Sequence, residues 1–368
     1  MRGEKADHQE REEPVARTFA AALLAWYHEN GRELPWRQTR DPYAIWLSEI
    51  ILQQTQVKQG WNYWERFMQR WPKVEDLAAA TEDEVLREWQ GLGYYSRARN
   101  LHYAARQIVD LGHFPDTLEE IRQLKGVGDY TAAAIGSIAF GLPAAVVDGN
   151  VYRVLARHFG IDTPINTTEG KKLFQSLAQS LLPVDKSLAS HLSPLTSEYN
   201  QAIMDFGAIQ CTPQSPRCNV CPLMESCIAF REGRVGALPV KQKTLKVKER
   251  HLIYIYVRCK GETAIHRRGP GDIWQGLWEP LCLEINEETF DVRDRLCASG
   301  ILLPLTSHLS PLKQNVRHVL THRILYADFY LLEVGEKPEL PSDYVWIKES
   351  ELDDYAKPRL IETLLCYC

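Results

Sequence analysis

The sequence predicts a helical domain followed by a smaller α+β domain. Residues up to about 230 show the spacing of successive amphipathic helices and no strand-like alternation of useful length. After Arg250 the pattern changes, and β-branched and aromatic residues alternate in part with others in HLIYIYVR, GLWEPLCLE and RILYADFYLLEV. A chain of 368 residues is long enough for two domains that each bury a core.

Local start signals support the helical assignment. Thr81 with Glu84 and Thr117 with Glu120 have the capping-box spacing that opens a helix, and Ser96 opens another. The C-terminal segment ELDDYAKPRLIETLLCYC returns to helical spacing. The first helix is predicted from one apolar face and from Gly31, a typical C-cap, at its end. The apolar face consists of Phe19, Leu23, Trp26 and Tyr27.

We expect a disordered tail over residues 1–14, a helical domain over 15–228, a basic linker over 229–250 and the α+β domain over 251–368. The linker stretch VKQKTLKVKER is compatible with two roles: a solvated connection between domains, or a basic segment that binds along a polyanion. The net charge of −5 argues mildly against a nucleic-acid partner, although phosphate binding depends only on the local surface.

The chain start favours a cytoplasmic location. MRGEKADHQEREEPVART is charged throughout and lacks the apolar core of a secretory signal. No apolar run approaches the roughly 20 residues that cross a bilayer, so no membrane partner is expected. Thiols stay reduced in the cytoplasm, so the nine cysteines need a reason other than disulfides.

Four cysteines lie close together in CTPQSPRCNVCPLMESC, with six, two and five residues between them. Four thiolates in one compact loop suit a tetrahedral zinc ion or an iron–sulfur cluster, and their spacing alone leaves both open. The remaining cysteines show no ligand spacing and are expected to be small hydrophobes: Cys259, Cys282, Cys297, Cys366 and Cys368. The predicted ligands are Cys211, Cys218, Cys221 and Cys227.

A Gly-Val-Gly turn occurs in LKGVGDYTAAAIG, where it would also fit a dinucleotide site. That reading fails because the preceding TLEEIRQLK is helical in pattern and the third glycine is missing. A helix, Gly126-Val127-Gly128 and a second helix form a hairpin instead. Its backbone N–H groups could hold an anion such as a DNA phosphate, and a purely structural hairpin is the alternative.

Two carboxylates are candidates for chemistry. Asp148 precedes the helix NVYRVLARHFG and is a good N-cap; near a sugar, its charge could also stabilise an oxocarbenium-like cation. Glu49 lies beside Ile45, Trp46 and Ile50 on a helix, where it could simply face solvent. In an apolar pocket its pKa would rise, and it could act as a general acid.

The cysteine spacing, the hairpin and the aspartate, in this order, resemble the endonuclease III superfamily of DNA glycosylases. PWRQTRDPYAIWLSEIILQQTQV, GLGYYSRARN and NQAIMDFGAIQC resemble its MutY branch, the adenine DNA glycosylases, and the likeness runs from about Leu34 to Cys227. GDIWQGLWEPLCLE resembles the start of the Nudix-like domain of that family. INEETFDVRDRLCASG lacks the acidic metal-binding box of a Nudix hydrolase, so the domain is expected to read damage rather than hydrolyse nucleotides.

The resemblance implies a monofunctional base-excision enzyme with a [4Fe–4S] cluster. Its substrate would be double-stranded DNA in which adenine lies opposite 8-oxoguanine or guanine. We expect a monomer in the bacterial cytoplasm, associated with the nucleoid. The rivals are an endonuclease III-like lyase for oxidised pyrimidines, a non-catalytic DNA sensor and a Nudix hydrolase.

The resemblance also assigns roles to residues. Glu49 would protonate adenine, Asp148 would stabilise the sugar cation or bond to it briefly, and Asn150 would position water. Tyr130 occupies the slot of the Schiff-base lysine in the lyase branch. Leu320 replaces an aromatic residue of the family's 8-oxoguanine reader element. The implied substrate-binding and phosphate-binding residues are Trp36, Arg37, Gln54, Tyr94, Gln201, Thr321, His322, Gly126 and Gly128.

Overall fold

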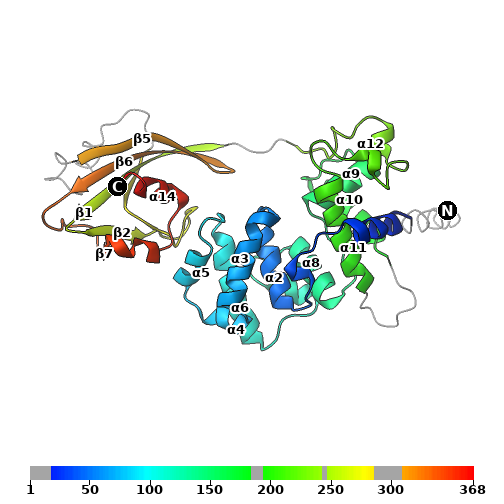
Figure 1. The fold of residues 1–368 in the computed structure, drawn as a ribbon, viewed down its shortest axis with the longest axis horizontal. Helices are drawn as coiled ribbons and strands as arrows, with labels where there is room; N and C mark the ends of the chain where they lie inside the picture. The colour runs from blue at the N-terminus through cyan, green and yellow to red at the C-terminus, as the bar shows by residue number, and fades with distance from the viewer. Residues whose placement is uncertain (1–17, 184–193, 243–246, 286–308) are drawn as a thin grey trace. The chain divides into compact units, whose positions relative to one another are not determined.

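The computed structural model describes residues 18–183, 194–242, 247–285 and 309–368. These residues form two compact units (Figure 1). The first comprises Met1–Ala78 and Tyr103–Lys243, and the second comprises Ala79–His102 and Thr244–Cys368. The N-terminal tail, Cys297 and the segment INEETFDVRDRLCASG lie outside the described residues, apart from Ile285 at its start. The domain limits expected from the sequence stay predictions.

The part before residue 232 is helical, as expected. Among its described residues no strand occurs. A helix over 18–30 comes first, with Phe19, Leu23 and Trp26 buried. The other helices are η1 (Pro35–Arg37), α2 (Pro42–Leu52), α3 (Val57–Arg70), α4 (Val74–Ala79), α5 (Glu82–Glu88), α6 (Ser96–Leu111), α7 (Leu118–Gln123), α8 (Asp129–Phe140), α9 (Gly149–His158), α10 (Thr168–Ser180), α11 (Pro194–Asp205), η2 (Phe206–Gln210), η3 (Cys218–Val220) and α12 (Ile228–Arg231).

Helix starts follow the local signals. Thr81 and Glu84 form the complete capping box at the start of α5. Thr117 accepts the backbone N–H of Glu120 at the start of α7. The element η2 is a π-helical turn that continues α11, and the Cys211 N–H reaches back five residues to the Phe206 carbonyl at 2.7 Å.

The Gly-Val-Gly segment joins α7 to α8, so the predicted hairpin is confirmed and no strand precedes the glycines. Gly126 has a φ of 82°, which favours glycine because a Cβ would crowd the backbone. Gly128 is the N-cap of the twelve-residue α8. Both glycines are exposed, while Val127 between them is buried.

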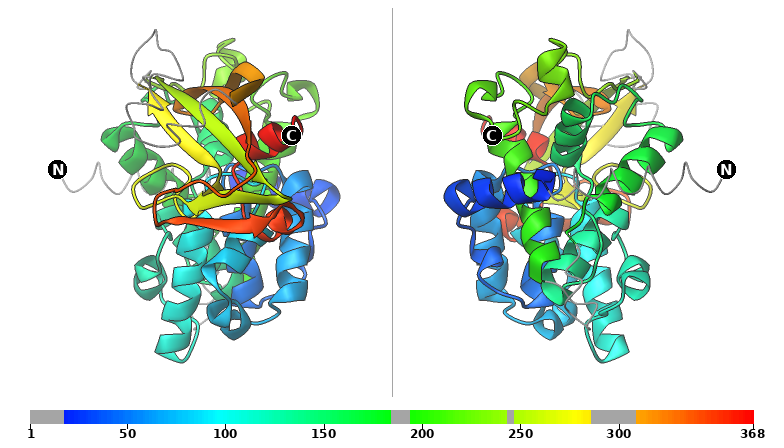
Figure 2. Two further views of the ribbon diagram at one scale, coloured as in Figure 1. Left: turned by 90° about the vertical axis from the view of Figure 1, so that its left-hand side faces the viewer. Right: turned by 90° about the vertical axis from the view of Figure 1, so that its right-hand side faces the viewer.

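The described residues of the C-terminal part form a seven-stranded mixed sheet and one α-helix. The combination of sheet and helix, visible in Figure 2, confirms the α+β expectation. Its central strand pair, β1 and β6, is parallel, while β2 and β4 flank β1 in antiparallel pairing. Helix α14 (Arg359–Leu365) buries Leu360, Ile361 and Leu364. The strands are β1 (Lys248–Cys259), β2 (Glu262–Arg267), β3 (Trp278–Glu279), β4 (Leu281–Ile285), β5 (Leu309–Val319), β6 (Arg323–Glu333) and β7 (Tyr344–Lys348).

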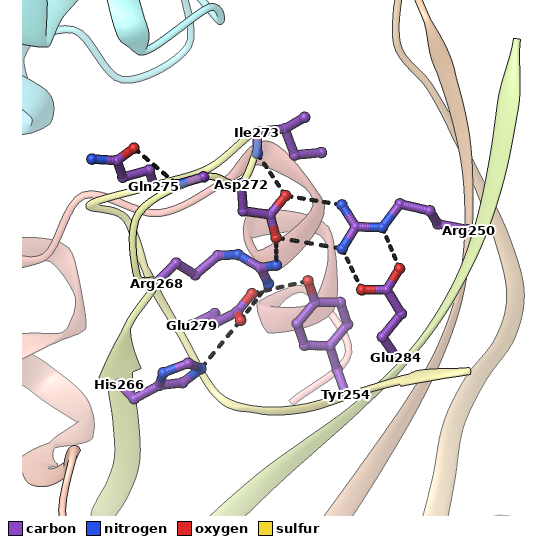
Figure 3. A network of polar contacts seen from close by, with 10 residues as sticks. Arg250, Tyr254, His266, Arg268, Asp272, Ile273, Gln275, Glu279 and Glu284 are labelled. Atoms are coloured by element: carbon purple, nitrogen blue, oxygen red, sulfur yellow. Dashed lines mark hydrogen bonds and ion pairs between the residues drawn. The ribbon is translucent and has the colours of Figure 1, made fainter. Parts of the chain in front are cut away.

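A network of charged side chains fixes the loop after β2 to the sheet (Figure 3). Asp272 accepts hydrogen bonds from Arg250 and Arg268. Burial alone would raise the pKa of Asp272, but these guanidinium groups hold that pKa well below its usual range. Glu279, almost fully buried, accepts from Arg268 and from the Tyr254 hydroxyl, the latter at 3.0 Å. The paired acids here therefore stabilise the loop.

Candidate active site

A cavity of about 480 Å³ opens in the helical unit. Its walls come from η1, α2, α8, the start of α9 and α11, which are far apart in sequence. The cavity is large enough for a nucleobase and its sugar. Seven of the predicted site residues line it: Trp36, Arg37, Glu49, Tyr130, Asp148, Asn150 and Gln201.

Glu49 faces this cavity from α2 and is only 9% exposed. The Tyr130 hydroxyl donates a hydrogen bond to Glu49 Oε2 at 3.0 Å. Burial raises the pKa of Glu49 to about 7, and the bond from Tyr130 only partly opposes this. The negative charge of Asp148 raises the pKa further. Near neutral pH, Glu49 therefore retains a proton that it can donate.

Asp148 is the N-cap of α9, as the sequence indicates. Its Oδ1 accepts the backbone N–H groups of Asn150 at 2.9 Å and Val151 at 2.8 Å, and its Oδ2 accepts the Asn150 side-chain amide at 2.7 Å. Burial raises the pKa of Asp148, and these hydrogen bonds oppose the rise because they favour the carboxylate. One cavity thus places two carboxyl groups in different surroundings, which suits an acid beside an anion.

Arg153 is a residue near the site that the sequence did not single out. Its Nη2 donates to Asn150 Oδ1 at 2.8 Å and to the Gly207 carbonyl at 2.6 Å, and its Nε donates to the Cys211 carbonyl at 2.7 Å. A Cβ at Gly207 would lie 2.7 Å from the Asn150 Cβ, so η2 packs directly against the start of α9. These contacts fix the position of Asn150 at the cavity wall.

Asp205 and Arg32 also belong to this site, although the sequence did not single them out. Asp205 is fully buried and accepts two hydrogen bonds from Arg37, each at 2.7 Å. It also accepts the Arg32 backbone N–H and Nε, each at 2.9 Å. Burial alone would raise its pKa, but the two guanidinium groups hold the pKa of Asp205 below its usual value. Asp205 therefore fixes two cationic side chains that line the cavity.

Replacing Asp205 with asparagine is expected to destabilise the protein by about 3 kcal/mol, because two largely buried guanidinium groups lose their counter-charge. The pKa of Asp205 is lowered, so its stabilisation is present above the ordinary carboxyl pKa and lost only as pH falls through the lowered value. Denaturant unfolding at pH 7 measures the change.

Asp162→Asn is the matched control, because Asp162 is exposed and lies 3.8 Å from Arg234. The control is expected to change stability by less than about 0.5 kcal/mol. Equal changes for the two variants would contradict the role of Asp205.

Aromatic and amide groups complete the cavity wall. Trp36 is 6% exposed, and Trp61 and Trp64 contact its ring edge-on, with ring centroids 5.8 Å and 5.6 Å away. Gln201 Nε2 donates to Ser197 Oγ at 3.1 Å, which orients the amide. A flat aromatic wall beside an oriented amide suits a planar, hydrogen-bonding ligand such as a nucleobase.

The other predicted residues lie outside the cavity lining. Gln54 follows α2 and is exposed, with a φ of 57° that is uncommon for a residue with a side chain. In the second unit, Tyr94 also has a positive φ, 47°, and its hydroxyl is hydrogen-bonded to Thr321 Oγ1. Thr321 and His322 are exposed between β5 and β6, next to Leu320.

The four predicted ligand cysteines line one small cavity of about 30 Å³. Burial raises the thiol pKa values of Cys218, Cys221 and Cys227, that of Cys221 to about 11, so deprotonation there needs a metal. Four thiols around one cavity are a donor set that suits a tetrahedral zinc ion or an iron–sulfur cluster.

No helix in the described ranges is both long and apolar enough to cross a lipid bilayer.

Comparison with known families defines the class of protein. Residues 47–180 match the HhH-GPD superfamily base excision DNA repair protein, residues 211–227 match the iron-sulfur binding domain of endonuclease III, and residues 253–366 match the NUDIX domain. The match to the iron-sulfur binding domain confirms the predicted [4Fe–4S] cofactor and decides against the zinc ion that the cysteine spacing had left open. The helix-hairpin-helix glycosylase fold with a C-terminal Nudix-like domain is confirmed as well.

Individual relatives narrow the class. The chain is 44% identical to the adenine DNA glycosylase of Mus musculus over 235 residues, covering 60% of this chain and 44% of that protein. It is 34% identical over 263 residues to the adenine DNA glycosylase of Buchnera aphidicola (strain Sg), covering 71% of this chain and 73% of that protein. A solved thermostable thymine-DNA glycosylase shares 30% identity with a TM-score of 0.54, over 60% of this chain and 98% of that one.

The chain belongs to the adenine DNA glycosylases, the MutY family of the endonuclease III superfamily. It spans less than half the length of the mouse relative.

Proposed function

We propose that the protein hydrolyses the N-glycosidic bond of adenine placed opposite 8-oxoguanine or guanine in duplex DNA, and that it acts as a monomer. One observation carries the proposal: Glu49, with a pKa of about 7, and Asp148 line the same cavity, which is large enough for a flipped nucleoside. The names of the relatives support adenine as the base. The base must leave the helical stack to reach this cavity.

The proposed reaction uses both carboxyl groups. Glu49 donates its proton to the adenine ring as the bond between the base and the C1′ atom breaks, so adenine leaves as a neutral molecule. Asp148 stabilises the positive charge that develops on the sugar, or bonds to it briefly. Water held by Asn150 and Glu49 then adds to C1′ and returns a proton to Glu49, which restores the starting state.

The remaining site residues hold the substrate. Trp36, Arg37 and Gln201 would contact the adenine, Gln54 and Tyr94 would fill the gap that the flipped base leaves, and the turn at Gly126 and Gly128 would bind a DNA phosphate. When bound, the cluster is a structural element that shapes the loop over residues 211–227.

A labelled duplex tests the activity. Adenine opposite 8-oxoguanine is offered beside adenine opposite guanine, adenine opposite thymine and thymine opposite guanine, and strands are cut with alkali after the reaction. We expect cleavage of the first two duplexes. Cleavage of the thymine mismatch alone would assign the enzyme to a different base, and binding without cleavage would leave a damage sensor.

Strand cleavage without alkali is expected to be absent. A lyase needs an amine to form an imine with the sugar, but the Tyr130 phenol cannot form one, and Lys125 precedes the hairpin turn and is exposed. Borohydride trapping measures this directly. An efficient covalent adduct would contradict the monofunctional assignment and favour the endonuclease III-like rival.

Thr321→Ala is expected to lower the preference for 8-oxoguanine over guanine by about 3- to 10-fold, the value of one hydrogen bond. The reason is the hydroxyl pair that Thr321 forms with Tyr94, which places a donor and acceptor where a damaged guanine could meet them. The ratio of single-turnover rates on the two duplexes measures the effect. Ser310→Ala removes an exposed hydroxyl from β5 of the same sheet and should leave the ratio unchanged.

A further inference from the structure

Arg157 is a buried cation in α9 that the proposed chemistry does not use. It is 3% exposed, and all five donor contacts of its guanidinium go to carbonyl oxygens or a cysteine sulfur. In the described ranges no carboxylate lies within ion-pair distance of it, in contrast to Arg37 with Asp205. A guanidinium removed from water without a counter-charge is costly, so its surroundings should supply one.

The contacts of Arg157 converge on the cysteine loop. Its Nη1 lies 3.4 Å from Cys211 Sγ and donates to the Thr212 carbonyl at 2.8 Å. Its Nη2 donates to the Pro213 carbonyl at 3.2 Å. At the other end of the loop, Cys227 Sγ donates to the Arg157 carbonyl at 3.5 Å.

The same residue therefore touches the first and the last cysteine of the loop, and its side chain lines their shared cavity. Its Nε also donates to the Leu238 carbonyl at 3.1 Å, eleven positions beyond Cys227. A [4Fe–4S] core held by four thiolates carries net negative charge, because the thiolates outweigh the iron–sulfur core. The missing counter-charge of Arg157 thus lies in the cavity that it lines.

We propose that Arg157 is the internal counter-ion of the iron–sulfur cluster and that it sets both the retention of the cluster and its reduction potential. A buried positive charge stabilises the more negative, reduced form, so it raises the potential. Loss of the charge favours the oxidised form, which loses iron more readily. The inference does not depend on which base the enzyme removes, because both quantities are measured without substrate.

The test compares two substitutions in the cluster-loaded protein. Arg157→Gln keeps polar donors but removes the charge. We expect the iron content per chain to fall at least twofold. We also expect the one-electron reduction potential of the cluster, measured by voltammetry on an electrode, to fall by ~59 mV, which is a tenfold change in the equilibrium between the reduced and the oxidised cluster. Arg157→Lys keeps the charge and should retain an iron content within about twofold of that of the unsubstituted protein. Its reduction potential should lie closer to that of the unsubstituted protein than the potential of Arg157→Gln does.

Arg217→Gln is the matched control. Arg217 lines the same cavity but is exposed, so water screens its charge. The equilibrium between the reduced and the oxidised cluster should therefore change by less than about threefold in Arg217→Gln. Unchanged iron content and potential in Arg157→Gln would overturn the proposal. If that variant is insoluble, Arg157→Lys decides alone: loss of the cluster there would show that hydrogen-bond geometry, not charge, holds the loop.

Discussion

Glu49→Gln is expected to slow adenine release by at least ~100-fold and up to ~10⁴-fold, because the amide cannot supply the proton that neutralises the leaving base. Binding of the mismatched duplex should be almost unchanged, since Gln can still accept the hydrogen bond from Tyr130. Single-turnover kinetics and a gel-shift assay separate the two effects. A variant with normal turnover would exclude Glu49 as the acid.

The pH dependence gives an independent check on Glu49. The rate of the unsubstituted enzyme should fall about tenfold per pH unit above about 7, where Glu49 loses its proton. The folded-state pKa is raised, so the buried carboxyl costs no stability below its ordinary pKa. The cost grows to about 3 kcal/mol as pH rises through 7. Glu49→Gln should therefore stabilise the protein at pH 8 and have little effect at pH 4.5, as thermal unfolding at both values would reveal.

Asp148→Asn is expected to slow base release by about 10²- to 10³-fold, because the developing sugar cation loses its nearby negative charge. Asparagine is as good an N-cap as aspartate, so α9 should keep its start and the protein its stability. A full-rate Asp148→Asn enzyme would show that the carboxylate serves only the fold.

A cap elsewhere supplies the control for Asp148. Thr167 caps α10 by accepting the Gly170 N–H at 3.0 Å and does not line the cavity. Thr167→Ala should lower stability by about 1 kcal/mol and leave the rate unchanged. Asp148→Ala, in contrast, should lose both activity and a similar amount of stability.

Much of the local structure could be predicted from the sequence because its causes are local. The capping pair of Thr81 and Glu84, the cap at Asp148 and the turn at Gly126 each depend on residues a few positions apart. The cysteine loop was predictable for the same reason. Its choice between zinc and an iron–sulfur cluster was not, because that choice depends on where the four thiols lie in space.

The contacts that shape the cavity could not be predicted. Asp205 pairs with Arg32 across 173 positions, and no local pattern marks an aspartate between Met204 and Phe206 as a partner of that arginine. The parallel pairing of β1 with β6 likewise joins segments about 75 residues apart. Such pairings depend on the packing of whole elements, which a single sequence does not encode in any short window.

The π-helical turn η2 has a consequence for insertions and deletions in this segment of the chain. Relative to an α-helix, a π turn contains one additional residue, and each residue advances a helix by about 100°. The turn lets one continuous run of chain direct Gln201 and Met204 toward the base cavity and then direct Cys211 toward the cavity of the cysteine loop. Deleting any single residue between Phe206 and Gln210 would restore a regular helix and rotate Cys211 away from its partners. The length of this segment should therefore tolerate less change than its side chains do.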